Sequence, residues 1–325
     1  MSVKDLVLEE LENNKGSYVS GGQLSKTLSV SRNSIWKAIK SLEKDGYSID
    51  AIPNRGYCLS SDSEILSAQS IAKYCNHSLT IEVYETITST NTVLKEKAGE
   101  GAEHGTVLVA KEQTSGRGRM GKEFYSPSQT GIYLSILLRP QFPASQSLFL
   151  TTAAAVATAR AIEDISSQKA QIKWVNDIYI GSKKVCGILT EAAFNIETNQ
   201  LDYAIVGIGV NLLKPSHFPS SIQDIATAVF DVPPEDPNYQ SIFVANLLNY
   251  FMEYYEHFES KEYLQEYIDR SMLIGKSIFV IRNNKSIPAT ALAINADCHL
   301  QVRYEDGTEE WLSSGEVSTK LSTES

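Results

Sequence analysis

Apolar positions in the first sixty residues repeat first at a helical spacing and then at a strand-like one. A helix is predicted over residues 3–14, where apolar side chains recur every three or four positions: Val3, Leu6, Val7 and Leu11. The next stretch predicts a short helix near 23–28, a tight turn, and a longer helix over 32–44 that Gly46 ends. After that glycine, YSIDAIPNRGYCL alternates like two short strands around a turn. Three helices followed by a hairpin predict a winged helix-turn-helix.

The helix predicted over 32–44 divides its residues between two faces. Ile35, Ile39 and Leu42 fall on one side, and Ser31 is suited to cap the start because its hydroxyl can accept from a first-turn amide. The other side carries polar and basic groups, as a helix that enters the major groove does. We therefore predict DNA contacts from this helix and from the wing tip: Ser31, Arg32, Asn33, Trp36, Lys37, Lys40 and Arg55.

Charge is distributed unevenly between this first unit and the rest of the chain. The net charge of −10 argues against a general polyanion binder. Residues 1–60, however, contain eight Lys/Arg against seven Asp/Glu, and over 26–44 the basic residues are accompanied by Glu43 alone. The alternative to DNA binding is an ordinary three-helix module with a solvated basic face. A single module would bind DNA weakly, so a dimer that reads two half-sites is expected.

Helical and strand-like segments alternate irregularly in the remainder of the chain. Strand-like segments separated by turns predominate up to residue 211, and an Ala-rich helix is predicted over 147–165. This order favours a mixed, largely antiparallel sheet over a repeated βαβ array. Residues 236–270 predict two helices, and short alternating strands from Gly275 onward predict a small SH3-like barrel. The fold class is therefore α+β, with predicted domains at 1–62, 63–270 and 271–325.

The stretch TSGRGRMGKEFYSP, residues 114–127, fits two phosphate-binding patterns. Gly116, Gly118 and Gly121 have the spacing of a dinucleotide fingerprint, and the same stretch fails as a P-loop because Glu123 replaces the required Ser or Thr. Both motifs need a helix that begins at the last glycine, whereas here the chain continues into a strand. What remains is a glycine-rich loop whose arginines suit carboxylate or phosphate oxygens. The alternative is a mobile surface loop that is merely basic.

A second polar cluster lies in KWVNDIYIGSKKVCGILTE. Residues 173–177 end one predicted strand and begin a hairpin, and Lys184 opens the return strand. Strand alternation places Lys184 on one face with Cys186 and Ile188. A lysine in line with apolar side chains usually has an anionic partner, and ATP beside a carboxylate substrate would supply one. The alternative is a lysine that snorkels at the rim of the hairpin.

Cysteine and hydropathy patterns exclude several classes of protein. The four cysteines are far apart and form no C-x-x-C pair, which indicates free thiols rather than a disulfide framework or a zinc site: Cys58, Cys75, Cys186 and Cys298. No apolar run approaches the roughly 20 residues of a membrane helix. The N-terminus is acidic and lacks the basic and apolar regions of a signal peptide. A cytoplasmic protein with no membrane partner is expected.

Five motifs in a fixed order resemble those of the biotin protein ligases. They are S-T-N at 89–91, Q-T-S-G-R-G-R at 113–119, K-W-x-N-D at 173–177, K-x-x-G-I-L-x-E at 184–191 and G-I-G-x-N at 207–211. With the winged helix, essentially the whole chain resembles the bifunctional members, which are also biotin-operon repressors. The resemblance implies that biotin is activated with ATP to biotinyl-5′-AMP and then transferred to a lysine of a biotin carboxyl carrier protein. It also implies Mg²⁺ as a cofactor and operator DNA as a partner.

The resemblance further implies roles for individual residues. Lys184 and Arg119 are the catalytic candidates, since cations must offset the repulsion between biotin's carboxylate and the α-phosphate. The biotin site is expected to comprise Ser89, Thr90, Asn91, Gln113, Arg117, Gly118, Arg119 and Lys184. The adenylate or ATP site is expected to comprise Gly116, Arg119, Phe124, Asn176, Asp177 and Asn211. Asp177 is also the candidate magnesium ligand.

Two positions depart from the family's pattern. Val175 replaces the usual proline after K-W, but no chemical group is lost, so little effect is expected. Phe124, followed by Tyr125, stands where many members have Trp; an aromatic ring can still cover adenine, although the indole N–H is lost. In the last domain, Trp311 and Glu316 are candidates to border the active site or the acceptor surface, with barrel packing as the alternative for Trp311.

Two other functions fit the same residues less well, and the two modules together suggest a mode of assembly. A lipoate ligase is disfavoured by the winged helix and the S-G-R-G-R motif, and a small-molecule sensor with an inactive ligase domain is disfavoured by Lys184, Arg117 and Arg119. Because one chain carries both modules, we expect the adenylate to favour a DNA-competent homodimer. The apolar strand GIYLSILLRP is a candidate dimer edge.

Overall fold

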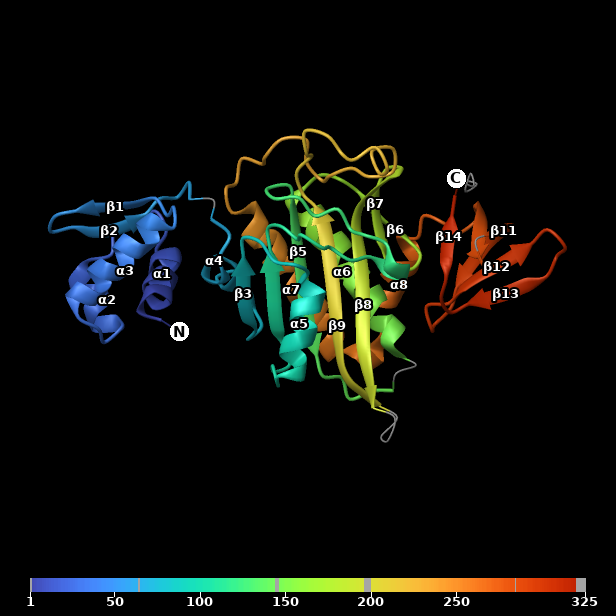
Figure 1. The fold of residues 1–325 in the computed structure, drawn as a ribbon, viewed down its shortest axis with the longest axis horizontal. Coiled ribbons are helices and arrows are strands. Elements are labelled where there is room, and N and C mark those ends of the chain that lie inside the picture. Colours follow the sequence, from blue (N-terminus) through green and yellow to red (C-terminus); the bar gives the residue numbers. More distant parts are fainter. Residues whose placement is uncertain (1, 64, 144–145, 196–199, 284, 320–325) are drawn as a thin grey trace. The chain divides into compact units, whose positions relative to one another are not determined.

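The computed structural model describes residues 2–63, 65–143, 146–195, 200–283 and 285–319 (Figure 1). The chain forms two compact units. The first comprises Met1–Asn76 together with Pro234–Asn246, and the second comprises His77–Pro233 together with Leu247–Ser325. No helix in the described ranges is both long and apolar enough to cross a membrane.

The first unit contains the predicted winged helix-turn-helix. Its elements are α1 (Val3–Asn13), α2 (Gly21–Thr27), α3 (Arg32–Lys44), β1 (Ile49–Ile52), β2 (Gly56–Leu59) and a short α4 (Ala68–Ala72). As predicted, the Ser31 side chain caps α3 by accepting a hydrogen bond from the Ser34 amide at 3.1 Å. The strands β1 and β2 pair antiparallel and form the wing. The short α4 begins after the wing, where the Ser67 side chain caps it.

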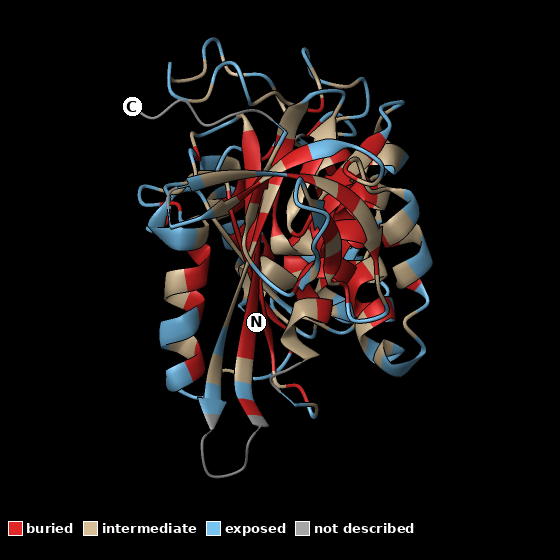
Figure 2. Cartoon of the chain, turned by 90° about the vertical axis from the view of Figure 1, so that its right-hand side faces the viewer, coloured by how far each residue is buried: buried red, intermediate tan, exposed pale blue. Residues whose placement is uncertain are grey.

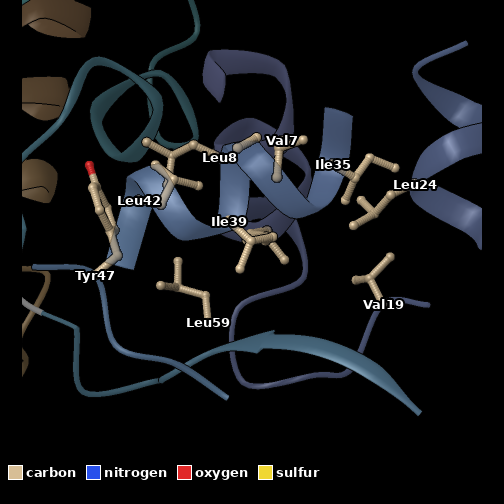
Figure 3. Packing of buried hydrophobic residues seen from close by; sticks show 11 residues of the cluster. Val7, Leu8, Val19, Leu24, Ile35, Ile39, Leu42, Tyr47 and Leu59 are labelled. Carbon is tan, nitrogen blue, oxygen red and sulfur yellow. The ribbon is translucent and has the colours of Figure 1, made fainter. Parts of the chain in front are cut away.

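The core of the first unit is built from apolar side chains of all three N-terminal helices and of the wing. Figure 3 shows these side chains gathered between the helices and the strand that carries Leu59: Val7, Leu8, Val19, Leu24, Ile35, Ile39, Leu42, Tyr47 and Leu59. Each buried aliphatic side chain of this kind contributes about 1.5–3 kcal/mol to folding. Burial of this face leaves the opposite face of α3 to solvent.

The second unit is organised around a seven-stranded sheet. Its strands are β3 (Thr80–Tyr84), β4 (Thr106–Ala110), β5 (Gly131–Leu138), β6 (Ala170–Lys173), β7 (Asp177–Ile180), β8 (Lys183–Asn195) and β9 (Gln200–Asn211). Their order is β3-β4-β5-β9-β8-β7-β6, and every pair is antiparallel except β3 with β4. The predicted mixed, largely antiparallel sheet is therefore confirmed. Figure 2 shows buried residues along the central strands and on helices packed against them.

The prediction that GIYLSILLRP is an exposed dimer edge is wrong. This segment forms β5, which is hydrogen-bonded to β4 on one side and to β9 on the other, and all eight of its residues are buried. A strand buried on both faces and both edges is as continuously apolar as an exposed apolar edge. The sequence pattern could not separate the two cases.

Helices cover both faces of this sheet (Figure 1). Asn91 of α5 (Thr90–Gly99) hydrogen-bonds to Glu191 of β8, whereas Thr151 of α6 (Ser147–Ile165) lies 2.7 Å, oxygen to oxygen, from Thr190 of the same strand. Adjacent strand residues point to opposite faces, so α5 and α6 lie on opposite sides. The two helices predicted near 236–270 are α7 (Tyr239–Glu256) and α8 (Tyr263–Asp269), with a 3-10 turn, η3 (Phe258–Ser260), between them.

The C-terminal part of the second unit is a separate five-stranded antiparallel sheet. Its strands are β10 (Ser277–Arg282), β11 (Lys285–Ile294), β12 (Leu300–Tyr304), β13 (Glu309–Leu312) and β14 (Glu316–Ser318). Their order is β13-β12-β11-β10-β14. The predicted small all-β domain is present, although no pairing between described residues closes β13 onto β14 to complete a barrel. The Trp174 Nε1 atom donates to the Cys298 carbonyl at 2.8 Å and ties this domain to the end of β6.

Candidate active site

A cavity of about 350 Å³ opens on the α5 face of the seven-stranded sheet. It is lined by every residue predicted for the biotin and adenylate sites except one: Ser89, Thr90, Asn91, Gln113, Arg117, Gly118, Arg119, Phe124, Asn176, Asp177, Lys184 and Asn211. The exception is Gly116, which lines a second hollow on the loop over 113–126. Motifs more than 100 residues apart in the sequence thus meet around one cavity. Glu316 also lines it, whereas Trp311 does not.

The floor of the cavity is bare backbone where two glycines meet. Gly187 of β8 lies directly opposite Gly209 of β9. A Cβ atom on Gly187 would lie 3.0 Å from Phe124 Cε2, and one on Gly209 would lie 2.5 Å from Phe124 Cε1. The Phe124 ring therefore rests in the space where these two residues lack side chains. This flat patch of backbone is about the size of an aromatic ring, so it can pack against Phe124 or against the planar part of a ligand.

One wall of the cavity is polar, buried and uncharged. The Ser89 side chain caps α5, and the Gln113 Oε1 atom accepts from the Thr90 amide at 2.9 Å. Ser135 Oγ lies 2.7 Å from Thr90 Oγ1 and 2.6 Å from Asn91 Oδ1. Since buried polar groups must be hydrogen-bonded, these mutual contacts fix the orientation of each amide and hydroxyl. The wall can therefore present fixed donors and acceptors to a neutral polar ligand.

Sequence reasoning missed two residues that hydrogen-bond to this wall without lining the cavity. Ser135 is fully buried in β5, and Glu191 of β8 accepts from Asn91 Nδ2 at 2.9 Å and pairs with Arg117 Nη1 at 3.2 Å. The signal for Ser135 was a lone serine inside an otherwise apolar strand. Glu191 stood at the end of a recognised motif and received no role. Together they connect the buried wall to the arginine of the loop.

The loop over 116–126 folds back on itself above the cavity. The Phe124 amide donates to the Gly116 carbonyl at 3.0 Å, and the Gly118 amide donates to the Lys122 carbonyl at 2.7 Å. A Cβ atom on Gly116 would lie 2.3 Å from the Phe124 carbonyl oxygen, so the two arms approach closely only because residue 116 is glycine. As predicted, no long helix follows the glycines, since η1 (Arg119–Gly121) spans a single turn. Both phosphate-loop motifs are thus excluded.

Two side chains of the loop reach across the cavity to other parts of the second unit. Arg119 Nη1 donates to Asn176 Oδ1 at 2.9 Å, and its Nη2 donates to the Gly315 carbonyl at 3.1 Å. Lys122 Nζ lies 2.8 Å from Glu316 Oε1. The arginine fork therefore joins the loop, the β6–β7 connection and the C-terminal domain. On another side of the cavity, Asn211 Nδ2 donates to the Thr227 carbonyl at 3.0 Å.

Lys184 points to the opposite face from the one that strand alternation predicted. The β7–β8 pairing shifts register between Tyr179/Lys184 and Ile178/Cys186, which leaves Val185 as an extra residue. Lys184 Nζ consequently lies 3.1 Å from where a Cβ atom on Gly187 would be, on the cavity side. A β-bulge, which alternation cannot anticipate, is the cause of the error.

The anionic partner expected for Lys184 is supplied by the protein itself. Lys184 Nζ lies 2.7 Å from Asp177 Oδ1, which is buried and accepts no directional hydrogen bond from any described residue. The contact is therefore an ion pair rather than a directed bond. Burial also raises the pKa of the Cys186 thiol, so this thiol stays neutral. The free thiols of Cys58, Cys186 and Cys298 are buried.

Lys173 also lines the cavity, although the sequence motif that contains it predicted no role for this residue. Burial lowers the pKa of its ammonium, and the neighbouring Lys184 lowers it further, whereas Asp177 opposes the shift. Its Nζ atom lies 5.8 Å from the centre of the Tyr179 ring. Burial likewise raises the pKa of Tyr179 to about 12, so this phenol stays neutral.

The residues fit a magnesium ion carried by a nucleotide but not one held by protein ligands alone. In the described part of the chain, no three His, Cys, Asp or Glu side chains are grouped to hold a metal ion. Magnesium often takes one or two carboxylates and completes its shell with phosphate oxygens and water. Asp177 can supply one such carboxylate oxygen.

In the first unit, the residues predicted to contact DNA are all exposed. Ser31, Arg32, Asn33, Trp36, Lys37 and Lys40 lie on the solvent face of α3. Trp36 is 50% exposed, which is unusual for so large an apolar side chain. Arg55 lies at the turn of the wing with its guanidinium carbon 4.1 Å from the centre of the Tyr18 ring. Lys40 is ion-paired with Glu43 at 2.5 Å.

Comparison with known proteins agrees with this architecture. An HTH domain model matches residues 4–58, the biotin/lipoate A/B protein ligase family model matches 83–211, and a biotin protein ligase C terminal domain model matches 273–320. The chain is 37% identical over 234 residues, 70% of each chain, to the bifunctional ligase/repressor BirA of Bacillus subtilis (strain 168). It is 26% identical over 309 residues, 94% of each chain, to the BirA of Escherichia coli (strain K12).

A solved structure supports the same conclusion. A biotin protein ligase from Aquifex aeolicus in complex with biotin and ATP superimposes with a TM-score of 0.61 at 28% identity, covering 74% of this chain and 97% of that one. Nearly all of that ligase aligns, whereas about a quarter of the present chain has no counterpart in the alignment. The chain belongs to the family of bifunctional biotin protein ligases and repressors.

Proposed function

We propose that this protein activates biotin with ATP to biotinyl-5′-AMP, transfers biotin to a lysine of a biotin carboxyl carrier protein, and represses transcription by binding operator DNA. The observation that carries the enzymatic part is the composition of one cavity. A buried, uncharged polar wall adjoins a cationic end that contains Lys184 and Arg119. A ligand with a neutral polar ring and a carboxylate matches both regions.

The first half-reaction joins two anions, and the chain supplies the charges that make this possible. A carboxylate oxygen of biotin attacks the α-phosphorus of ATP, the bond to the β-phosphate oxygen breaks, and pyrophosphate leaves with the electron pair. Lys184 is placed to offset the repulsion between carboxylate and phosphate, and Arg119 to bind the charge that develops in the transition state. The wall around Thr90, Asn91 and Gln113 would hold the ureido ring by hydrogen bonds.

Magnesium, when bound with the nucleotide, would neutralise part of the triphosphate charge. Asp177 is the residue that we propose as its protein ligand, because it is the carboxylate nearest Lys184 and the remaining ligands can come from phosphate and water. The same carboxylate pairs with Lys184 when no substrate is bound.

In the second half-reaction, the ε-amine of the acceptor lysine attacks the carbonyl carbon of biotinyl-5′-AMP. The carbon–oxygen bond to the phosphate breaks, AMP leaves with the electron pair, and the amine loses a proton. The folded loop over 116–126 would keep water from the adenylate before the acceptor arrives. Its contacts with Asn176, Gly315 and Glu316 hold it over the cavity.

The regulatory part of the proposal rests on the exposed face of α3 and the wing. Arg32, Lys37 and Arg55 are exposed cations suited to phosphates, and Asn33 is a polar residue suited to a base edge. One such module binds DNA weakly, so we propose a homodimer whose formation depends on biotinyl-5′-AMP. Sedimentation velocity with and without the adenylate tests this, and an unchanged association constant would contradict it.

Biotin-dependent ATP–pyrophosphate exchange tests the enzymatic proposal directly. We expect exchange with biotin and none with lipoate, because the uncharged hydrogen-bonding wall suits a ureido ring and has no counterpart in an alkyl disulfide. Exchange with lipoate alone would make the protein a lipoate ligase. Absence of exchange with either acid would make it a ligand sensor without ligase activity.

A further inference from the structure

Lys173 lines the cavity and forms no ion pair with any described residue. It is the last residue of β6 and faces Asp177 across the β6–β7 pairing. No carboxylate among the described residues lies within ion-pairing distance of its ammonium, and Asp177 is instead paired with Lys184 at 2.7 Å. Two lysines thus flank one carboxylate, which leaves a net positive charge at this end of the cavity.

Glu316, which also lines the cavity, and Glu191, which lies beside it, are committed to other cations. Glu316 pairs with Lys122 at 2.8 Å, and Glu191 pairs with Arg117 at 3.2 Å. Burying a cation without a partner is costly, so a site of this kind is completed by an anion that comes with the ligand.

The position of Lys173 limits which anion this is. Biotin's carboxylate and the α-phosphate must meet at Lys184, so they occupy the place beside the Asp177 pair. Lys173 stands on the other side of Asp177, on a neighbouring strand, where a group that extends beyond the α-phosphate would reach. We propose that Lys173 binds the β- and γ-phosphates of ATP and holds the pyrophosphate as it leaves.

This assignment rests on the proposed ligase function and adds a residue to its first half-reaction. The pyrophosphate takes the electron pair of the broken bond, so a cation beside it stabilises the developing charge. Lys173 has no part in the transfer step, in which no pyrophosphate is present. The two half-reactions should therefore respond differently to its removal.

The test uses Lys173→Met, Lys173→Arg and, as a matched control, Lys169→Met, whose exposed lysine lies outside the cavity. ATP–pyrophosphate exchange gives KM for ATP and for pyrophosphate, and calorimetry with biotin alone gives the biotin Kd. Transfer is measured separately, from preformed biotinyl-5′-AMP to a carrier domain. Lys173→Met should raise both KM values roughly 10- to 100-fold and keep the biotin Kd and the transfer rate within about twofold. Lys173→Arg should recover most of the loss.

Unchanged KM for pyrophosphate in Lys173→Met would overturn the assignment. Slow transfer from preformed adenylate would also overturn it, because that result would place Lys173 in the second half-reaction. If Lys173→Met does not bind biotin, Lys173→Gln replaces it under the same two criteria. Failure of the wild-type protein to exchange with biotin would instead refute the proposed function, so the two failures are distinguishable.

Discussion

The ring of Phe124 fills the space that Gly209 leaves empty on the sheet surface. A Cβ atom on Gly209 would lie 2.5 Å from Phe124 Cε1. Phe124 belongs to the loop over the cavity, whereas Gly209 belongs to β9, which is hydrogen-bonded to a strand on each side. A side chain at 209 would therefore displace the ring and raise the cavity floor together.

Gly209→Ala should weaken substrate binding without unfolding the protein. The clashing atoms are at the far end of one side chain in a loop, so the loop can shift at small cost. We expect KM for biotin or ATP to rise about tenfold, since a shift of 1.4 kcal/mol in binding corresponds to that factor. Steady-state exchange kinetics measure both KM values. If KM for biotin and KM for ATP are both unchanged, the contact of the Phe124 ring with Gly209 does not contribute to binding.

Gly207→Ala is the contrasting change on the same strand. Its Cβ atom would lie 2.0 Å from Asn91 Oδ1, which is buried and also accepts from Ser135. The network cannot yield without leaving polar groups unsatisfied, at roughly 1–3 kcal/mol each. We expect lower stability toward urea as well as lost biotin binding. Equal unfolding midpoints for Gly207→Ala and Gly209→Ala would contradict this distinction.

Lys184→Ala should abolish adenylation and leave the fold intact. Lys184 is partly exposed, so its removal costs little stability, while the carboxylate and α-phosphate lose the cation between them. Loss of one such electrostatic group lowers the rate roughly 100- to 1,000-fold. The neighbouring Lys183→Ala is the control, because that lysine donates to the Gln223 carbonyl at 3.1 Å and does not line the cavity. Near-normal exchange in Lys184→Ala would refute the assigned role.

Arg119→Lys should shorten the lifetime of the bound adenylate. The guanidinium fork reaches Asn176 and Gly315 at once, and a lysine ammonium cannot reproduce that geometry. We expect biotinyl-5′-AMP to dissociate about tenfold faster in stopped-flow measurements. Lys122→Ala should change the rate much less, because exposed ion pairs contribute about 0–1 kcal/mol. A larger effect from Lys122→Ala than from Arg119→Lys would contradict the importance of the fork.

Arg32→Ala and Lys37→Ala should weaken DNA binding and spare ligation. Both side chains are exposed on α3, so neither substitution removes a core contact. Each lost phosphate contact should reduce the slope of log affinity against log salt by about 1. Lys276→Ala, which removes an exposed lysine of the other unit, serves as the control. Fluorescence anisotropy with operator DNA measures the slopes, and unchanged slopes would indicate a merely solvated basic face.

Glu12 gives the first unit a pH-dependent stability. It is buried, and burial raises its pKa, although Lys15 and Lys73 oppose the shift. The folded unit thus keeps this proton to higher pH than the unfolded chain does. The resulting stabilisation is present below the unfolded pKa and is lost as pH rises through the folded pKa. The protection factors of the α1 amides, which correct for the intrinsic exchange rate at each pH, should accordingly be higher near pH 5 than near pH 8.

Glu12→Gln should flatten that dependence, because glutamine stays neutral throughout. Lys15 keeps two acceptors in this variant, the Ser63 carbonyl at 2.8 Å and Asn238 Oδ1 at 2.7 Å. Its own pKa is lowered by burial, which adds a dependence of opposite sign at higher pH. A pH profile that is the same in wild type and Glu12→Gln would assign the dependence to other groups.

Local patterns predicted the elements that are stabilised by local contacts. The cap at Ser31, the apolar face of α3 and the two-residue alternation of the wing depend on neighbours within a few positions. The strands of the second unit were also predicted, since turns and alternation mark them. Ordered motifs then indicated most of the residues that line the cavity, because each motif keeps its spacing on one element.

Features that depend on distant pairing could not be predicted. Whether β5 lies at an edge or in the centre depends on β9, which is more than 60 residues away. The face of Lys184 depends on a bulge opposite Tyr179. Ser135 and Glu191 acquire their roles only when β5 and β8 approach α5. Such facts belong to the three-dimensional arrangement rather than to any single stretch.

The contacts between the loop over 116–126 and the C-terminal domain affect the fraction of time that the loop is closed over the cavity. Arg119 and Lys122 attach to Gly315 and Glu316, and Trp174 holds the same domain at Cys298. A chain that ended after α8 would retain every residue proposed to bind biotin, yet its loop would have to find the closed state by chance. The domain raises the effective concentration of the closed loop, so it acts on the frequency of productive encounters rather than on the chemistry.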